Sequence, residues 1–342
     1  MANLTDTYIA HEKEWLSPYA MLTENTRGRK TPCEVNDGRT EYRTEYQRDR
    51  DRIIHSQSFR RLMNKTQVFL APAGDHYRTR LTHTLEVTQI ARTLARALRL
   101  NEDLTEAIAL GHDLGHTPFG HAGEQAMQEC YDPSFAHYTQ SLRVVDRLEK
   151  NGKGLNLTWE VRNGIVNHTG DSRAATLEGL LVKFADRIAY INHDIDDACR
   201  AGIMQISDIP AELREVLGET HSGRINTMVT SIIRCSWDKN DIAMEPQVAE
   251  ATKKLRAFLF ENVYTNPVAK SQEIKSRALL VKLFEYYVSH PDAMPTLYRN
   301  NVESEGIERC VCDFLSGMTD RYAIETYNEL NVPRVWRGLN IN

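Results

Sequence analysis

Residues 112–121 read His-Asp-Leu-Gly-His-Thr-Pro-Phe-Gly-His, and this stretch carries three imidazoles and one carboxylate. Its two glycines and its proline must bend the backbone. Metal coordination and phosphate chemistry both need imidazole and carboxylate groups held close together. Seven of the chain's 12 histidines lie between residues 83 and 193, so we expect the chemistry of the protein to be concentrated in that third of the chain.

Apolar residues recur at helical spacing on both sides of this stretch. Residues 81–100 and 103–114 are each predicted to form one amphipathic helix. Further helices are predicted over residues 139–150, 158–168, 176–198, 211–220, 223–235, 246–262, 271–289, 305–316 and 319–330. The best candidate for an extended piece is short and covers residues 65–70. The sequence therefore predicts an all-α protein.

Length and composition permit one large helical assembly. A chain of 342 residues with 41% hydrophobic content can bury a large core. We predict a basic N-terminal extension with an arginine-rich segment (residues 1–64), a helical catalytic core (65–235) and a helical C-terminal part packed on that core (236–342). The six cysteines include no Cys-x-x-Cys pair, and neither a signal sequence nor a run of about 18 apolar residues occurs. We therefore expect a cytoplasmic protein with reduced thiols and no membrane association.

The arginine-rich segment has two interpretations. Between Arg27 and Arg61 the sequence holds 10 Lys or Arg against 6 Asp or Glu, although the whole chain has a formal charge of −5. The first interpretation is a solvated surface whose charges form salt bridges. The second is a rim that binds phosphates, including those of single-stranded nucleic acid.

Helical geometry turns three polar residues toward the core. His83 shares a helix face with Val87 and Ile90, because offsets of four and seven residues return to nearly the same direction. A single inward histidine is more often a hydrogen-bonded core residue than a metal ligand. His112 also continues an apolar stripe, and its neighbour Asp113 would be costly to bury without a cation or hydrogen-bond donors. Together the three polar residues indicate a metal site.

The helix predicted over residues 176–198 has a polar side opposite its apolar side. Asp186, Tyr190 and His193 lie on the polar side, with Asp194 at its edge. Such a helix can be an ordinary surface helix or the wall of a pocket. Its polar face is acidic, aromatic and imidazole-bearing, and it lacks the Lys and Glu alternation of solvated helices. We therefore favour a pocket wall that supplies a fourth metal ligand.

The order of these residues resembles a known signature. His83, then His112-Asp113, then Asp186 is similar to the metal signature of the HD superfamily of metal-dependent phosphohydrolases, whose fold is all-helical. Residues 112–121, with Arg-Leu-Thr-His before them and Asp-Arg-x-x-Tyr-x-x-x-Asp after them, resemble the dGTPase-like branch of that superfamily, the deoxynucleoside triphosphate triphosphohydrolases. The likeness extends from Ser17-Pro-Tyr-Ala20 to Phe258-Leu-Phe-Glu-Asn-Val-Tyr264 and so covers nearly the whole chain.

This resemblance implies an HD-domain core that binds one divalent metal ion per subunit. The implied ligands are His83, His112, Asp113 and Asp186. Two imidazoles and two carboxylates leave Mn²⁺, Fe²⁺, Co²⁺, Ni²⁺, Mg²⁺ and Zn²⁺ all open. In the family, water attacks the α-phosphorus, the 5′ oxygen of the deoxynucleoside departs and intact triphosphate is released. We therefore expect hydrolysis of dGTP or other deoxynucleoside triphosphates (dNTPs), and nothing in the sequence separates the four bases.

The resemblance also assigns roles to residues around the metal. His121 is expected to protonate the departing 5′ oxygen, and His116 and His137 to bind the α-phosphate, although His137 can exchange roles with His121. The residues matched to substrate binding are Arg80 and Arg187 for the phosphates, Tyr190 and Asp194 for the sugar and its 3′-hydroxyl, and Gln67 for the edge of the base or sugar. The residues expected to support this site from outside are His168, His193 and Asp197.

Two other functions stay open at this point. An HD phosphomonoesterase or phosphodiesterase acting on other nucleotides keeps the metal but needs neither triphosphate-binding arginines nor a tyrosine against the sugar. A nucleotide-regulated oligomer would instead bind single-stranded nucleic acid through residues 27–61, with an affinity that falls steeply as salt rises. The family resemblance further implies a homo-oligomer, for example a hexamer, and a nucleotide effector.

Overall fold

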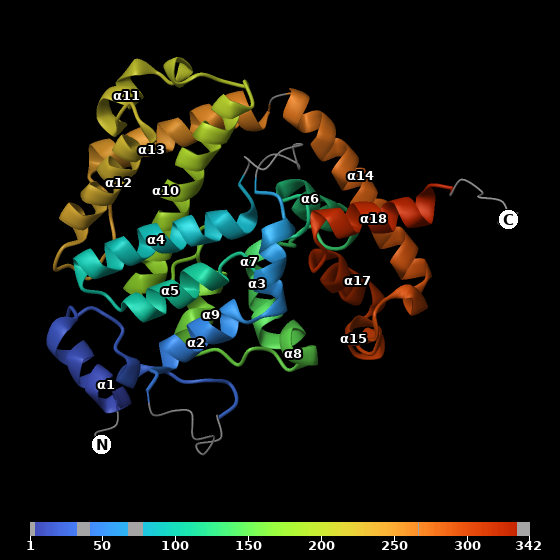
Figure 1. The fold of residues 1–342 in the computed structure, drawn as a ribbon, viewed down its shortest axis with the longest axis horizontal. Helices are drawn as coiled ribbons and strands as arrows, with labels where there is room; N and C mark the ends of the chain where they lie inside the picture. The colour runs from blue at the N-terminus through green and yellow to red at the C-terminus, as the bar shows by residue number, and fades with distance from the viewer. Residues whose placement is uncertain (1–3, 33–41, 68–77, 266, 334–342) are drawn as a thin grey trace, which may run out of the picture.

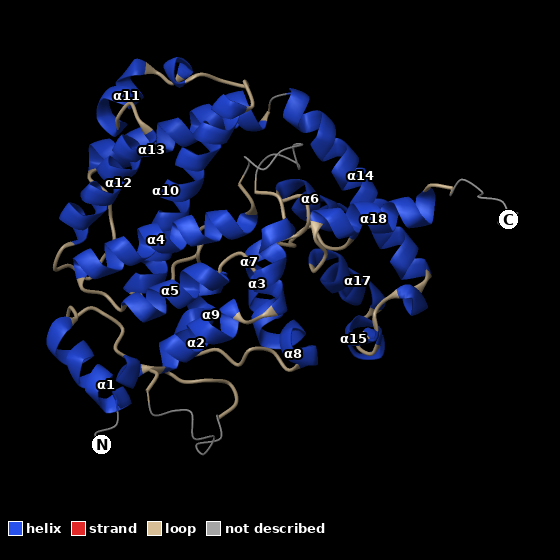
Figure 2. Cartoon of the chain, viewed as in Figure 1, coloured by secondary structure: helices blue, strands red, loops and turns tan. Residues whose placement is uncertain are grey.

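The computed structural model describes residues 4–32, 42–67, 78–265 and 267–333, and every regular element in these ranges is a helix (Figure 2). The α-helices are α1 (Leu4–Trp15), α2 (Glu45–Ile54), α3 (Gln57–Arg61), α4 (Arg80–Leu98), α5 (Glu102–Gly111), α6 (His121–Cys130), α7 (His137–Arg143), α8 (Glu149–Gly152), α9 (Trp159–Val166), α10 (Leu177–Arg200), α11 (Ala211–Leu217), α12 (His221–Ser236), α13 (Pro246–Leu259), α14 (Pro267–Ser289), α15 (Thr296–Arg299), α16 (Val302–Glu305), α17 (Ile307–Ser316) and α18 (Asp320–Asn331). Within these ranges extended residues pair only at isolated bridges, Arg29 with Thr158 and Thr66 with Thr79. The prediction of an all-α protein is confirmed.

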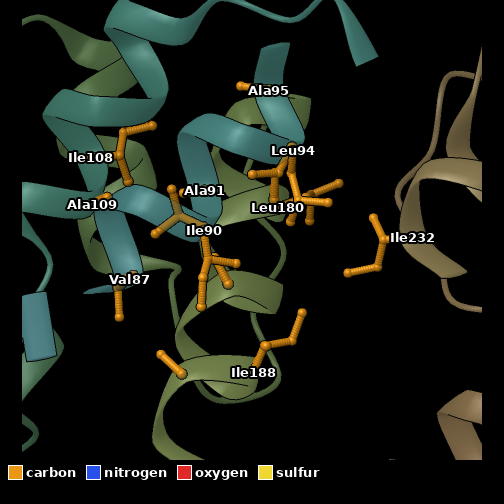
Figure 3. Close-up of a cluster of buried hydrophobic side chains, with 14 of the residues drawn as sticks. Val87, Ile90, Ala91, Leu94, Ala95, Ile108, Ala109, Leu180, Ile188 and Ile232 are labelled. Carbon is orange, nitrogen blue, oxygen red and sulfur yellow. The ribbon is translucent and has the colours of Figure 1, made fainter. Parts of the chain in front are cut away.

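Helix α10 runs through the larger of two hydrophobic cores. It packs against α4, α5, α9, α12 and α13. Val87 and Leu94 of α4 and Ile188 of α10 are fully buried in this first core (Figure 3). Burying one such side chain stabilises a fold by about 1.5–3 kcal/mol. The helices that carry His83 and Asp186 are therefore packed firmly against each other.

A second hydrophobic core joins α6 to the C-terminal helices. Phe119 and Met127 belong to the same buried cluster as Leu283 of α14 and Phe314 of α17, and α6 packs along α14 (Figure 1). We call residues 112–121 the motif loop. This loop begins in the first core, where Leu114 is buried, and ends in the second. Its conformation therefore depends on how the two cores are packed together.

Local hydrogen bonds explain where the central helices begin and end. Thr79 and Thr176 are the N-caps of α4 and α10, and each side chain accepts a hydrogen bond from a backbone N–H in the first turn. Helix α5 ends at Gly111, earlier than the predicted end at residue 114. The reason is that the ring of His112 hydrogen-bonds the carbonyl oxygen of Ala109, which would otherwise accept the next helical N–H.

Apolar periodicity did not predict helices α1, α2 and α6. Helix α1 has no buried residue, so it has no apolar face turned to a core. Helix α2 does carry a readable signal, because Thr44 and Gln47 form a reciprocal capping box at its start. The extended piece predicted over residues 65–70 is described only in part, because residues 68–70 lie outside the described residues. In the described part, Thr66 pairs with Thr79 in an isolated bridge.

Arginines of the N-terminal segment make ion pairs within the fold. Arg29 contacts Asp49 and lies 2.6 Å from Glu45, and its side chain is only 5% exposed. Arg50 lies 3.2 Å from Glu106 of α5. These contacts favour the salt-bridged interpretation of the segment over a phosphate-binding rim.

Among the described helices, none combines the length and the apolar character that crossing a membrane requires. The five cysteines in the described ranges form no disulfide bond with one another, and Cys33 lies outside those ranges. The predicted division of the chain at residues 64 and 235 stays a prediction.

Candidate active site

Three elements bring the four predicted metal ligands together, and we call these four residues the metal group. His83 lies in the first turn of α4, His112 and Asp113 directly follow α5, and Asp186 lies in α10. The Nε2 atom of His83 is 3.1 Å from Oδ1 of Asp186. The Nε2 atom of His112 is 3.5 Å from Oδ2 of Asp113 and 3.9 Å from Oδ1 of Asp186. Ligand atoms about 2.1 Å from a shared ion lie roughly 3–4 Å apart, so these separations suit one divalent metal.

An unpaired imidazole nitrogen supports this assignment. His112 is fully buried, and its Nδ1 lies 2.6 Å from the carbonyl oxygen of Ala109. This contact assigns the proton to Nδ1 and leaves the lone pair of Nε2 facing the two carboxylates. That Nε2 has no hydrogen-bond partner among the described residues. A buried polar atom without a partner is unfavourable, and coordination to a metal ion removes that cost.

The two carboxylates of the metal group are held ionised. Burial alone would raise the pKa of Asp113, but His112 and Arg80 lower that pKa well below its usual range. Burial would likewise raise the pKa of Asp186, but the hydrogen bond of His83 and the neighbouring imidazoles lower that pKa to about 2. Arg80 is buried, and its guanidinium donates a hydrogen bond of 2.5 Å to Asp113. Ionised carboxylates are the form that binds a divalent ion.

A second cluster of imidazoles lies beside Asp113. The rings of His116 and His137 are stacked with centroids 4.5 Å apart, and the ring of His116 is 6.0 Å from that of His121. Asp113, His116 and His137 present ligand atoms within 4.8 Å of one another. Burial and the charge of Arg80 lower the pKa of His116 well below its usual range, so its imidazole is neutral. The predicted phosphate-binding histidines therefore adjoin the metal group.

Glu124 of α6, which was not singled out from the sequence, joins these imidazoles. Its carboxylate is 3.2 Å from Nδ1 of His137 and 3.6 Å from Nδ1 of His121, and it accepts a hydrogen bond from the backbone N–H of His137. Burial would raise the pKa of Glu124, but the two histidines lower it far below its usual range. Burial would lower the pKa of His137, but Glu124 raises it. The available signal was spacing, since residues three apart on a helix share one face. We call His116, His121, Glu124 and His137 the histidine group.

His121 differs from the other imidazoles of the histidine group in exposure. Its side chain is 80% exposed, whereas that of His137 is 14% exposed and His116 is buried. His121 begins α6, directly after Phe119 and Gly120, which both have positive φ. This turn starts a new helix at His121 and brings it to the same carboxylate as His137. Of the three imidazoles, His121 is the one that remains open to solvent.

The predicted sugar-binding residues follow Asp186 along α10. Tyr190 and Asp194 lie one and two turns further along the helix. Oδ2 of Asp194 accepts a hydrogen bond from the hydroxyl of Tyr264, a contact that was not foreseen from the sequence. Burial raises the pKa of Asp194 to about 7. Oδ1 of Asp194 has no partner in the described part of the chain, so this carboxyl can accept a further hydrogen bond.

In the part of the chain that the structure describes, two predicted substrate-binding residues make no side-chain hydrogen bond or ion pair with these groups. Gln67 reaches Arg80 only through its backbone carbonyl oxygen, at 3.4 Å. Arg187 neighbours Asp186 on α10, and within the described ranges its guanidinium makes no hydrogen bond or ion pair with the metal group. Arg80 itself pairs with Asp113, so it already lies where a phosphate oxygen would approach the site.

The three residues expected to support the site have different surroundings. The ring of His168 is 5.0 Å from that of His112 and 5.4 Å from that of His137, so it lies between the two groups. Burial and these neighbouring histidines lower the pKa of His168 to about 3. His193 lies 3.1 Å from a carboxylate oxygen of α4, and Asp197 is paired with an arginine that precedes α4. The latter two residues therefore join α10 to α4.

Family models match two parts of the chain. Residues 80–191 match the HD domain, and residues 242–329 match the phosphohydrolase-associated domain. The chain is 53% identical over 335 residues to a deoxyguanosinetriphosphate triphosphohydrolase-like protein of Caldanaerobacter subterraneus subsp. tengcongensis, with 97% of this chain and 98% of that protein covered. This chain belongs to the deoxyguanosinetriphosphate triphosphohydrolase-like family.

One more relative and one solved structure are similar to this chain. A protein of the same description from Desulfatibacillum aliphaticivorans is 44% identical over 352 residues, which covers 96% of this chain and 98% of that protein. The fold is similar to that of a phosphohydrolase from Bacteroides thetaiotaomicron, with a TM-score of 0.52, 19% identity, and coverage of 82% of this chain and 68% of that one. The protein is thus a phosphohydrolase with an HD domain, and that domain implies a divalent metal.

Proposed function

We propose that this protein hydrolyses dNTPs to the deoxynucleoside and inorganic triphosphate. The observation that carries the proposal is the position of Asp113, which adjoins His83 and His112 on one side and His116 and His137 on the other. A phosphate oxygen at the metal group would therefore lie within reach of the histidine group. The two relatives described above, at 53% and 44% identity, are both named deoxyguanosinetriphosphate triphosphohydrolase-like proteins.

The metal group would hold one divalent ion, which would polarise the α-phosphate and the attacking water. The guanidinium of Arg80 donates hydrogen bonds to Asp113 and, at 3.2 Å, to the carbonyl oxygen of Thr66. These contacts fix its orientation, in which it could also bind a phosphate oxygen. His116 is neutral and buried, and its Nδ1 has no partner among the described residues. This imidazole is free to make a hydrogen bond to the α-phosphate.

We assign the proton transfer to His121. A water oxygen forms a bond to the α-phosphorus and releases one proton to solvent, while the bond from phosphorus to the 5′ oxygen breaks. That oxygen takes a proton from the His121 imidazolium, and solvent returns a proton to His121. Glu124 stabilises this imidazolium by its charge. His137 is more deeply buried and closer to Glu124, and its raised pKa favours a cation that offsets charge on the phosphate. These differences support His121 over His137 as the proton donor.

The sugar is proposed to contact α10. The free Oδ1 of Asp194 can accept the hydrogen bond of the 3′-hydroxyl. Tyr190 lies in α10 one turn after Asp186 and one turn before Asp194. This position, between the metal group and the proposed partner of the 3′-hydroxyl, supports a tyrosine ring packed against the sugar. A ring in contact with C2′ leaves no room for a 2′-hydroxyl, so deoxyribonucleotides would be preferred.

A product assay tests this function. Each dNTP and its ribonucleotide counterpart is incubated with the protein and one of Mn²⁺, Fe²⁺, Co²⁺, Ni²⁺, Mg²⁺ or Zn²⁺, and the products are separated by ion exchange. We expect equal amounts of deoxynucleoside and triphosphate, with heavy oxygen from labelled water found in the triphosphate. Asp113→Asn, which removes a charge from the metal group, controls for contaminating hydrolases. Release of phosphate or pyrophosphate instead would contradict the proposal and favour a phosphomonoesterase or phosphodiesterase.

The homo-oligomer, the nucleotide effector and the binding of single-stranded nucleic acid stay predictions. The ion pairs of Arg29 and Arg50 inside the fold give no support to nucleic-acid binding. Light scattering measures the first expectation, and a change of mass on adding dGTP would support the second.

A further inference from the structure

A carboxylate of the C-terminal helices contacts the motif loop. Asp320 is the first residue of α18 and is 6% exposed. Its Oδ1 accepts a hydrogen bond of 2.9 Å from the backbone N–H of Phe119 in the motif loop. Its Oδ2 accepts one of 2.8 Å from the backbone N–H of Thr66 and another from the Thr66 hydroxyl. Asp320 therefore joins the motif loop to residues 65–67.

Both of these segments support residues of the proposed reaction. Phe119 has a φ of +63°, an unfavourable backbone conformation for a residue with a Cβ, and lies two residues before His121. The carbonyl oxygen of Thr66 accepts a hydrogen bond of 3.2 Å from Arg80. A Cβ placed on Gly120 would lie 3.3 Å from the carbonyl oxygen of Gln67, so the two segments are also in close contact. The position of Asp320 thus affects the turn before His121 and the support of Arg80 together.

Lys65 makes a second connection between the C-terminal helices and the motif loop. Its side chain is buried, and Nζ donates hydrogen bonds to the carbonyl oxygens of His116, at 2.5 Å, and Ser316, at 2.8 Å. Ser316 is the last residue of α17. In the described ranges, no hydrogen bond or ion pair joins residues 307–323 to His83, His112 or Asp186. The C-terminal helices therefore contact the phosphate-binding side of the site and leave the metal group to the first core.

We propose that Asp320 is a positioning residue, which sets the motif-loop turn and Arg80 in their places relative to the metal group. This role rests on the proposed function. Asp320 does not touch substrate; it acts through Phe119 and Thr66. It also gives the C-terminal helices a specific part in the reaction, because their packing on α6 alone would not orient a backbone N–H of the loop.

Asp320→Asn tests this role with almost no change in side-chain volume, because the amide nitrogen cannot accept the hydrogen bonds that a carboxylate oxygen accepts. We expect kcat for triphosphate release to fall roughly 10- to 100-fold, since a displacement of about 1 Å of a catalytic group has an effect of that size. The affinity for Mn²⁺, measured by calorimetry without nucleotide, should change far less than kcat, because Asp320 reaches Asp113 only indirectly, through Thr66 and Arg80. Amide hydrogen exchange of residues 115–124 should become faster.

Thr319→Ala is the matched control. The Thr319 hydroxyl caps α18 by accepting a hydrogen bond of 3.2 Å from the backbone N–H of Tyr322. Thr319 adjoins Asp320, and in the described ranges no hydrogen bond joins its side chain to the motif loop. This variant should lower the melting temperature and leave kcat unchanged. Thr66→Val should resemble Asp320→Asn, and Thr66→Ser, which retains the hydroxyl, should recover most of the kcat that Thr66→Val loses.

Three results would overturn the positioning role: a wild-type kcat in Asp320→Asn, an equal loss of kcat in Thr319→Ala, or a loss of Mn²⁺ affinity parallel to the loss of kcat. The last two would indicate general destabilisation. A wild-type protein that releases no triphosphate contradicts the proposed function instead. In that case hydrogen exchange of residues 115–124 in the Asp320→Asn protein still decides whether Asp320 holds the loop.

Discussion

Glu124 contacts two imidazoles at once, and these contacts distinguish the roles of His121 and His137. His137 is the nearer of the two, and although burial would lower its pKa, Glu124 raises that pKa and so favours the protonated form. His121 is 3.6 Å away and open to solvent, which suits the proposed proton donor. In the proposed reaction, one carboxylate would therefore support both a charged phosphate-binding group and a proton donor.

Replacing Glu124 by Gln tests this arrangement. The charge is lost and the shape is kept, so we expect kcat to fall about 100- to 10,000-fold, the usual contribution of general acid–base catalysis. His121→Asn should lose a similar factor, and the double variant should be no worse than the poorer single variant, because both residues act in one step. Steady-state kinetics with dGTP measures the three effects, and Mn²⁺ calorimetry checks that the metal group is intact. Losses that add up in the double variant would separate the two residues.

The pKa of Asp194 leads us to predict that substrate binding depends on pH near neutrality. Burial raises its pKa to about 7, so the ionised fraction grows as the pH rises through that value. The ionised form accepts hydrogen bonds from Tyr264 and from a substrate hydroxyl better than the neutral form does. We therefore expect the KM for dNTPs to fall between about pH 6 and about pH 8, and Asp194→Asn to raise KM roughly tenfold and to remove this dependence.

A substrate without a 3′-hydroxyl is the control for Asp194. Its KM should show little of this pH dependence with the wild-type protein, because the proposed hydrogen bond is absent. The same pH profile with both substrates would assign the titration to another group.

At the scale of elements, the motif loop and α7 are in backbone contact at Gly115. A Cβ on Gly115 would lie 2.1 Å from the backbone nitrogen of Ser141, which is closer than any real contact. The Ser141 hydroxyl also donates a hydrogen bond of 2.8 Å to the carbonyl oxygen of His112 and accepts one of 2.9 Å from the N–H of Gly115. Since α7 begins with His137, this contact sets the distance between His137 and the loop.

Gly115→Ala should therefore move α7 away from the loop. We expect a loss of about 1–3 kcal/mol in the free energy of unfolding, as for other overpacked sites, and a fall in kcat, because the stacking of His137 on His116 is disturbed. Gly202→Ala is the control, because nothing lies within 4 Å of its Cβ. Its φ of +69° adds a backbone strain that Gly115 does not have, so any smaller loss in this variant sets apart the effect of the close contact at Gly115. Urea unfolding compares the two. A kcat equal to that of Gly202→Ala would show that the contact at Gly115 does not position His137.

The sequence predicted the helices whose apolar residues recur at helical spacing and pack within the first core. Helices α4 and α10 each present an apolar stripe to that core, so helical spacing also predicted the inward direction of His83. Helix α6 was not predicted, because its core-facing residues include the small Ala122 and Ala126, whose partners come from helices far along the chain. The contact of Asp320 with Phe119 spans 201 residues, and no local pattern reports a pairing over that distance.

At the scale of the whole molecule, the metal group joins three helices of the first core. A ligand that binds only the folded protein stabilises it by about 2.7 kcal/mol at a concentration 100 times its dissociation constant. For a chain of 342 residues this corresponds to a rise of roughly 4 °C in melting temperature. We therefore expect Mn²⁺ to raise the melting temperature and a chelator to reverse the rise.

Two variants locate this stabilisation. His112→Ala removes the buried Nε2 that lacks a partner, so calorimetric melting should show no Mn²⁺-dependent rise. Asp320→Asn leaves the metal group intact, so its melting temperature should rise with Mn²⁺ as much as that of the wild type. An equal rise in His112→Ala would place the ion elsewhere in the molecule. A smaller rise in Asp320→Asn would mean that this variant binds Mn²⁺ more weakly, because the rise in melting temperature depends on the affinity of the folded protein for the ion. The C-terminal helices would then support the metal group as well.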